Sequence, residues 1–243
     1  MLHLVGDRVA LVKALGETQA VIVGHDWGAP VAWNAALLRP DSFRAVTGMS
    51  VPFASRGPTE LLAALSNQGN DDFYMQYFQT PGVAEAELER DVTATIRLVS
   101  FNASGDGPDS VAFGRLQSGN FLGKLVEPVM LPDWLSADDI AEYAAVFSRI
   151  GFRGGLNWYR NLARSWELLA PWRGAVIRQP SLFIAGSRDD VLKFPHSRAN
   201  MDRFAHTLPG LRGSHILHSA GHWIQRERAA AVNDLRVGFL RGL

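Results

Sequence analysis

Hydrophobic positions change spacing along the first fifty residues in a way that separates helices from strands. Apolar residues over 4–15 recur at intervals of three, four and seven, which predicts a helix ending at Gly16 in a left-handed cap. Residues 20–23 are apolar on both faces, as expected of a buried strand in a parallel sheet. Residues 29–38 predict a second helix, and residues 43–51 predict another strand. This order of elements indicates an α/β sheet with crossover connections.

The pattern becomes helical after residue 52. Residues 53–172 contain amphipathic segments at 85–99 and 137–150, with breaks rich in Gly, Asp and Ser near 102–109. The alternation typical of strands does not occur in this stretch. We therefore expect a helical insertion, or cap, over residues 53–172.

Strand character then resumes towards the C-terminus. Residues 180–186 and 215–218 predict strands, and residues 226–240 predict a closing helix. The chain is thus expected to form an α/β core from residues 1–52 and 173–243, interrupted by the cap.

Composition narrows the class of protein. Hydrophobic residues make up 47% of the 243 positions and include 13 Phe and 7 Trp, enough to form a core and unlike a disordered chain. Lys plus Arg and Asp plus Glu are both 24, and this balance argues against nucleic-acid binding. The absence of Cys excludes a disulfide scaffold, a thiol nucleophile and a Cys-ligated metal. With no signal-peptide pattern and no apolar run of membrane-spanning length, we expect a cytoplasmic protein without a membrane span.

The sequence Gly24-His-Asp26-Trp-Gly28 lies between a predicted strand and a predicted helix. This is the form of a nucleophile elbow, in which the central residue stands in a strained turn. The chain passes close to itself there, so we expect both outer positions to require small residues. Asp26 would stand beside the N-terminus of the helix, which stabilises its negative charge, and the N–H of Trp27 would face a developing oxyanion.

An aspartate in this position restricts the substrate. Attack by a carboxylate on an acyl carbon would give an anhydride, whereas attack on an sp³ carbon gives an ordinary alkyl ester. Epoxides and carbon–halogen bonds are the natural electrophiles for Asp26. Peptidase and ordinary esterase activities are therefore disfavoured.

In folds built around a nucleophile elbow, the nucleophile is followed along the chain first by an acid and then by a histidine. The loop after the strand at 180–186 contains Asp189 and Asp190, and the spacing leaves either open as the acid. His222 follows the last predicted strand and is the candidate base. His25, inside the elbow, is given a supporting role at most.

Several segments together resemble the epoxide hydrolase branch of the α/β-hydrolase superfamily, over essentially the whole chain. They are Val-Gly-His-Asp-Trp-Gly-Ala-Pro at 23–30, Tyr-Phe-Gln-Thr-Pro-Gly-Val-Ala-Glu at 77–85, Gly-Leu-Asn-Trp-Tyr-Arg-Asn at 155–161, Ala-Gly-Ser-Arg-Asp-Asp-Val-Leu at 185–192 and Ala-Gly-His-Trp at 220–223. The resemblance implies an α/β-hydrolase fold with a helical cap.

The resemblance also implies site residues and chemistry. The family's acid corresponds to Asp189, and its two epoxide-binding cap tyrosines correspond to Tyr74 and Tyr159. Asp26 would open a small hydrophobic epoxide while the tyrosines protonate its oxygen, and His222 would then activate water to release a vicinal diol. No metal or organic cofactor is implied, and detoxification is the expected role. Tyr77 and Tyr143 are expected to be structural.

The sequence departs from the family at its beginning. The family's first strands and its His-Gly-x-Pro loop, which supplies the other oxyanion donor, have no counterpart in these residues. The core sheet is therefore expected to lack its usual first strands, and the strand at 20–23 to expose an apolar edge open to homodimer formation. Loss of one oxyanion donor lowers the rate of the step that needs it by on the order of 10²–10³-fold, so impaired turnover is expected. Haloalkane dehalogenation with the same Asp26 and an inactive fragment or interaction module are the alternatives.

Overall fold

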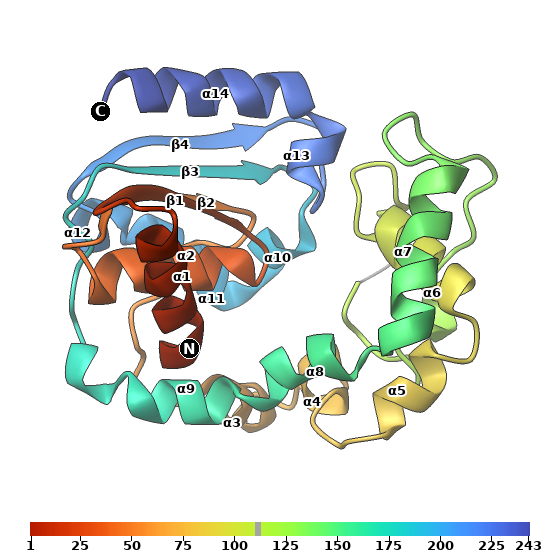
Figure 1. Ribbon diagram of the computed structural model, residues 1–243. Coiled ribbons are helices and arrows are strands. Elements are labelled where there is room, and N and C mark those ends of the chain that lie inside the picture. The colour runs from red at the N-terminus through yellow and green to blue at the C-terminus, as the bar shows by residue number, and fades with distance from the viewer. Residues whose placement is uncertain (110–112) are drawn as a thin grey trace. The chain divides into compact units, whose positions relative to one another are not determined.

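The computed structural model describes residues 1–109 and 113–243. The chain divides into two compact units (Figure 1). The first unit consists of Met1–Gly57 and Glu167–Leu243, and the second of Pro58–Trp166. Within the described ranges, no helix has the length and apolar character needed to cross a membrane.

The first unit is built on a four-stranded sheet with the order β1-β2-β3-β4 (Figure 1). All neighbouring strands are parallel, so each connection must cross back along the sheet. The second unit is inserted in the connection between β2 and β3. The strands are β1 (Ala20–His25), β2 (Phe43–Met49), β3 (Ser181–Gly186) and β4 (Leu211–Leu217).

Helices cover both faces of this sheet, because alternate side chains of a strand point to opposite faces. Phe183 of β3 is buried with Trp33 on one face, whereas Ile184 is buried with Val232 on the other. Figure 1 shows α14 on one side of the sheet and α1, α2 and α11 on the other. The helices of this unit are α1 (Leu2–Ala14), α2 (Gly28–Leu38), the 3₁₀ turn η2 (Ala170–Trp172), α10 (Asp190–Lys193), α11 (Pro195–Asp202), α12 (Phe204–Thr207), α13 (Ile224–Glu227) and α14 (Ala229–Arg241).

The first strand is less buried than its apolar residues predict, and it forms the exposed sheet edge that was expected of it. Among the described residues β1 pairs only with β2, so it forms an edge of the sheet. Only Gly24 of its six residues is buried, and Val23 is 37% exposed. The burial of β1 is therefore set by its single neighbouring strand and not by its apolar composition.

The second unit is helical. Its helices α6 and α7 pack against each other, and Arg97 of α6 forms an ion pair with Glu127, with Nη2 and Oε1 2.6 Å apart. Its helices are α3 (Leu61–Asn67), α4 (Tyr74–Tyr77), α5 (Val83–Leu88), α6 (Val92–Asn102), η1 (Leu122–Lys124), α7 (Ala137–Ile150) and α8 (Arg153–Arg160), and α9 (Leu162–Leu168) crosses the division between the units.

Helix α7 has its predicted bounds, and Gly16 has the predicted positive φ, at 78°. Three predicted boundaries were wrong. The segment at 85–99 is two helices, because the Asp91 side chain accepts a hydrogen bond from the N–H of Ala94 and starts a new helix. The closing helix is likewise divided, between α13 and α14, and β4 begins four residues earlier than predicted.

Candidate active site

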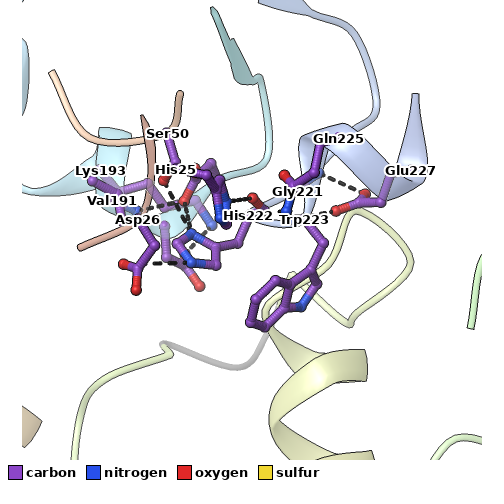
Figure 2. Close-up of polar contacts among 12 residues, drawn as sticks. His25, Asp26, Ser50, Val191, Lys193, Gly221, His222, Trp223, Gln225 and Glu227 are labelled. Carbon is purple, nitrogen blue, oxygen red and sulfur yellow. Dashed lines mark hydrogen bonds and ion pairs between the residues drawn. The ribbon is translucent and has the colours of Figure 1, made fainter. Parts of the chain in front are cut away.

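A sharp turn between β1 and α2 carries Asp26 (Figure 2). Asp26 has a φ of 50°, in the left-handed region that residues other than Gly rarely adopt. A Cβ atom on Gly24 would lie only 2.0 Å from the carbonyl oxygen of Gly28, so Gly24 must be glycine. A Cβ atom on Gly28, by contrast, would meet no atom of the described residues within 4 Å. The expectation that both glycines must be small is therefore right for Gly24 and wrong for Gly28.

The turn places Asp26 at the N-terminus of an eleven-residue helix. Trp27 is the residue that precedes this helix, so its backbone N–H lies where the helix dipole favours negative charge. The Asp26 side chain is 41% exposed, which leaves the carboxylate accessible to a ligand.

His222 lies between two carboxylates. Its Nε2 atom is 3.6 Å from Oδ1 of Asp26, and its Nδ1 atom is 3.3 Å from Oδ1 of the buried Asp189. Asp190 instead forms an ion pair with Lys193, with Oδ1 and Nζ 2.6 Å apart. The structure thus brings Asp26, His222 and Asp189 together and directs Asp190 to a different partner.

The two carboxylates change the ionisation of His222. Burial alone would lower its pKa, but the charge and hydrogen bond of Asp189, with the charges of Asp26 and Glu227, raise the pKa to about 9. Burial would raise the pKa of Asp189, but the charge and hydrogen bond of His222 and a hydrogen bond from Ser50 lower it below its usual range. Each member of the pair therefore favours the charged form of the other.

Three side chains hold the loop that carries His222 (Figure 2). Glu227, 8% exposed, accepts hydrogen bonds from the backbone N–H groups of Gly221 at 2.8 Å and Trp223 at 2.9 Å, on either side of His222. His25 Nε2 lies 2.7 Å from the carbonyl oxygen of His222. Burial and the charge of His222 lower the pKa of His25, so neutral His25 donates this bond. Ser50 Oγ lies 3.0 Å from His222 Nδ1.

The second unit brings Tyr74 and Tyr159 together. Their ring centroids are 5.5 Å apart in a T-shaped arrangement, and both rings pack edge-on against Phe78. Tyr77 donates a hydrogen bond to Glu87 at 2.8 Å, and burial followed by this hydrogen bond raises the pKa of Tyr77. Tyr143 is 45% exposed on α7. Of the four tyrosines, the two singled out by the sequence are thus the pair in ring contact.

The residue after Tyr159 fixes the position of this pair. Arg160 forms two hydrogen bonds with the Glu85 carboxylate, at 2.7 and 2.9 Å, and donates a third to the carbonyl oxygen of Phe78 at 2.9 Å. This guanidinium lowers the pKa of the Glu85 carboxyl group to about 2. A bidentate pair of this kind fixes orientation as well as distance, so α8 is held against the segment that carries Phe78.

Comparisons with known proteins show the family and the fold. A family model described as the alpha/beta hydrolase fold matches residues 3–229. Epoxide hydrolase A of Mycobacterium tuberculosis is 43% identical over 99% of this chain and 74% of the relative. The chain belongs to the epoxide hydrolases. A solved epoxide hydrolase from an endophytic Streptomyces is 44% identical, with a TM-score of 0.93 over 98% of this chain and 72% of that one. Epoxide hydrolase I of potato, 33% identical, superimposes with a TM-score of 0.89 over 100% of this chain and 76% of the other.

Sequence reasoning missed Ser50 and Glu227 in this epoxide hydrolase, whereas the contact of His25 with the His222 carbonyl fits the supporting role expected of it. Glu227 lies five positions after His222 on the next helix, and that spacing was a usable signal. No sequence pattern pointed to Ser50, because its approach to His222 depends on β2 and β3 being neighbours in the sheet.

The two glycines of the elbow are expected to differ sharply on substitution. Gly24→Ala should lower the free energy of unfolding by about 3 kcal/mol, because its methyl group overlaps the Gly28 carbonyl. Gly28→Ala, at the start of α2, should leave stability unchanged or slightly raised, since alanine favours helix. Denaturant unfolding measures both, and equal stability of the two variants would contradict the close approach at Gly24.

Proposed function

We propose that this chain hydrolyses an epoxide to a vicinal diol through an ester formed on Asp26, with the second unit acting as the cap. The observation that carries the proposal is the carboxylate at the tip of the elbow, 3.6 Å from a histidine that is itself paired with a buried aspartate. A carboxylate nucleophile gives a hydrolysable ester only when it attacks a saturated carbon.

In the first step an oxygen of Asp26 attacks a ring carbon and the carbon–oxygen bond of the epoxide breaks. The ring oxygen takes a proton from Tyr74 or Tyr159, because an alkoxide is far more basic than a phenolate. The product is a hydroxyalkyl ester of Asp26. Ester formation removes the negative charge of Asp26, which is one of the causes that raise the pKa of His222. His222 thus becomes easier to deprotonate when the ester forms.

Before the second step His222 releases its Nε2 proton to solvent, and it regains this proton once Asp26 is charged again. The free Nε2 then takes a proton from water, and the water oxygen attacks the carbonyl carbon of the ester. The backbone N–H of Trp27 stabilises the tetrahedral oxyanion. The bond from this carbon to the alkyl oxygen then breaks, His222 protonates that oxygen, and the diol leaves. The proton released as Asp26 regains its charge restores the phenol of the tyrosine, so only epoxide and water are consumed.

The test of the proposal is an assay of the purified chain with a small aryl epoxide and, separately, with a small haloalkane. We expect diol from the epoxide and no halide from the haloalkane. The dehalogenase alternative is not favoured by the relatives, which are named epoxide hydrolases. Halide release without diol formation would overturn the proposal.

Removal of the Tyr159 hydroxyl should slow ring opening. We expect Tyr159→Phe to lower the rate of ester formation by about 10²-fold, since proton donation to a reacting oxygen contributes at least this much. The ring contacts with Tyr74 and Phe78 are retained in this variant. Tyr143→Phe is the matched control, because Tyr143 is exposed on α7, and it should form the ester at the original rate. Equal rates of ester formation in the two variants, measured by stopped flow, would refute the role of Tyr159.

Homodimer formation, a cytoplasmic location, detoxification and the absence of nucleic-acid binding stay predictions from the sequence. The feature that supports self-association is the outer edge of β1, where Val23 is exposed.

A further inference from the structure

Ser50 stands in a strained turn directly after β2. Its N–H donates to the carbonyl oxygen of Ile184 at 2.9 Å, and the N–H of Val51 donates to the carbonyl oxygen of Met49 at 2.9 Å. With a φ of 69° at Ser50, this is the rarer and more strained form of the three-residue γ-turn. Glycine adopts such a φ without strain, so the presence of a serine points to a use for its side chain.

The Ser50 side chain interacts with both members of the buried pair, and Figure 2 shows it beside the His222 ring. Its Oγ lies 3.0 Å from Nδ1 of His222, closer than the 3.3 Å between Nδ1 and Asp189. Ser50 also forms a side-chain hydrogen bond with Asp189 that lowers the pKa of this carboxyl group. A hydroxyl has one donor and two acceptor sites. These contacts are satisfied together when Ser50 donates to Asp189 and accepts from the Nδ1–H of His222.

We infer that Ser50 is a positioning residue of the His222–Asp189 pair, whose hydroxyl keeps Nδ1 protonated and Nε2 directed at Asp26. The inference rests on the proposed function, because it assigns Ser50 to the ester-hydrolysis step. Ring opening does not use Nε2 of His222 as a base. Ser50 therefore acts on one step of the reaction and leaves the other unchanged.

A second buried serine provides a matched control. Ser181, at the start of β3, is as fully buried as Ser50, and its Oγ has no hydrogen-bond partner among the described residues. Burial alone thus does not require a serine hydroxyl of this sheet to be paired. Ser181→Ala removes a hydroxyl from the same sheet without touching His222.

The kinetic test compares Ser50→Ala, Ser50→Gly and Ser181→Ala in single-turnover reactions with a small aryl epoxide. We expect Ser50→Ala to form the ester at the original rate and to hydrolyse it about tenfold more slowly, because the ring loses the hydrogen bond that keeps Nε2 directed at Asp26. Ser50→Gly also relieves the backbone strain and should show the same kinetic defect. Ser181→Ala should leave both rates unchanged. Unaltered ester hydrolysis in Ser50→Ala, or an equal slowing of both steps, would overturn the inference.

A titration without epoxide separates this inference from the proposed function. NMR of the His222 ring nitrogens should give a lower pKa in Ser50→Ala than in the original chain, because the lost hydroxyl accepts more strongly from the charged ring. The comparison is valid because the other groups that act on His222 are the same in both proteins. These groups are Asp26 and His25 at the elbow, Asp189 and Asp190 at α10, and Glu227 on α13. An unchanged His222 titration would overturn the inference whether or not the chain forms diol.

Discussion

Asp26→Asn is expected to abolish the covalent adduct with an epoxide and to lower diol formation by on the order of 10⁴-fold or more. The amide has no charged oxygen with which to attack a ring carbon. The substitution suits the site, because Asn tolerates the left-handed φ of 50° at this position as well as Asp does. Intact-mass spectrometry after exposure to a small aryl epoxide measures the adduct, and product chromatography measures the diol.

The control for this variant is its thermal unfolding, which should remain cooperative. Peptide mapping of the unaltered chain should place the adduct on the peptide that contains Asp26. An adduct of the same mass and stoichiometry on Asp26→Asn would show that another side chain is the nucleophile, and would contradict the assignment.

His222→Asn is expected to trap the ester. Ring opening by Asp26 should still occur, whereas hydrolysis should slow by on the order of 10⁴-fold, because no base remains at the position of Nε2. Asparagine is the appropriate replacement, since its side-chain nitrogen stands close to the position of Nδ1 and can still donate to Asp189. Mass spectrometry should therefore find one persistent adduct per chain and a single turnover of epoxide. Continued multiple turnover would exclude His222 as the base.

The same variant should also lose a pH dependence of stability. The pKa of His222 is raised from 6.5 to about 9 in the folded chain. Protonated His222 therefore stabilises the folded chain fully below pH 6.5, and this contribution is lost as the pH rises through 9. In the unaltered chain the free energy of unfolding should fall by on the order of 3 kcal/mol across this range, at about 1.4 kcal/mol per pKa unit. In His222→Asn that fall should be absent, and a fall of equal size in both proteins would assign it to other groups.

Local patterns in the sequence were sufficient to predict much of the fold. The turn at Asp26 could be predicted because a strand, a required glycine and a helix follow one another within ten residues. The break at Asp91 was missed because the apolar spacing continues across it, although Asp91 is a favourable first residue for a helix. The exposure of β1 could not be predicted from its own residues, since it depends on which strands lie beside it.

Some residues of the candidate site could also be predicted from the sequence, and others required the structure. Asp26 and His222 were found from motifs, and the choice between Asp189 and Asp190 required the structure, which pairs Asp190 with Lys193 one helical turn away. Ser50 is 172 positions from His222 along the chain, and no spacing links the two. Their contact follows from the sheet, which places the end of β2 beside β3 and thus beside the loop that carries Asp189. The roles given to these residues stay predictions until the variants are measured.

A single turnover in water labelled with heavy oxygen tests the ester on Asp26 most directly. Excess enzyme is mixed with a small aryl epoxide in labelled water, and the diol and the peptide containing Asp26 are analysed by mass spectrometry. If Asp26 forms the ester, the diol from this first turnover contains ordinary oxygen taken from the carboxylate, and Asp26 gains the label. Label in the first diol, with none in Asp26, would mean that water attacks the epoxide directly and would contradict the covalent mechanism.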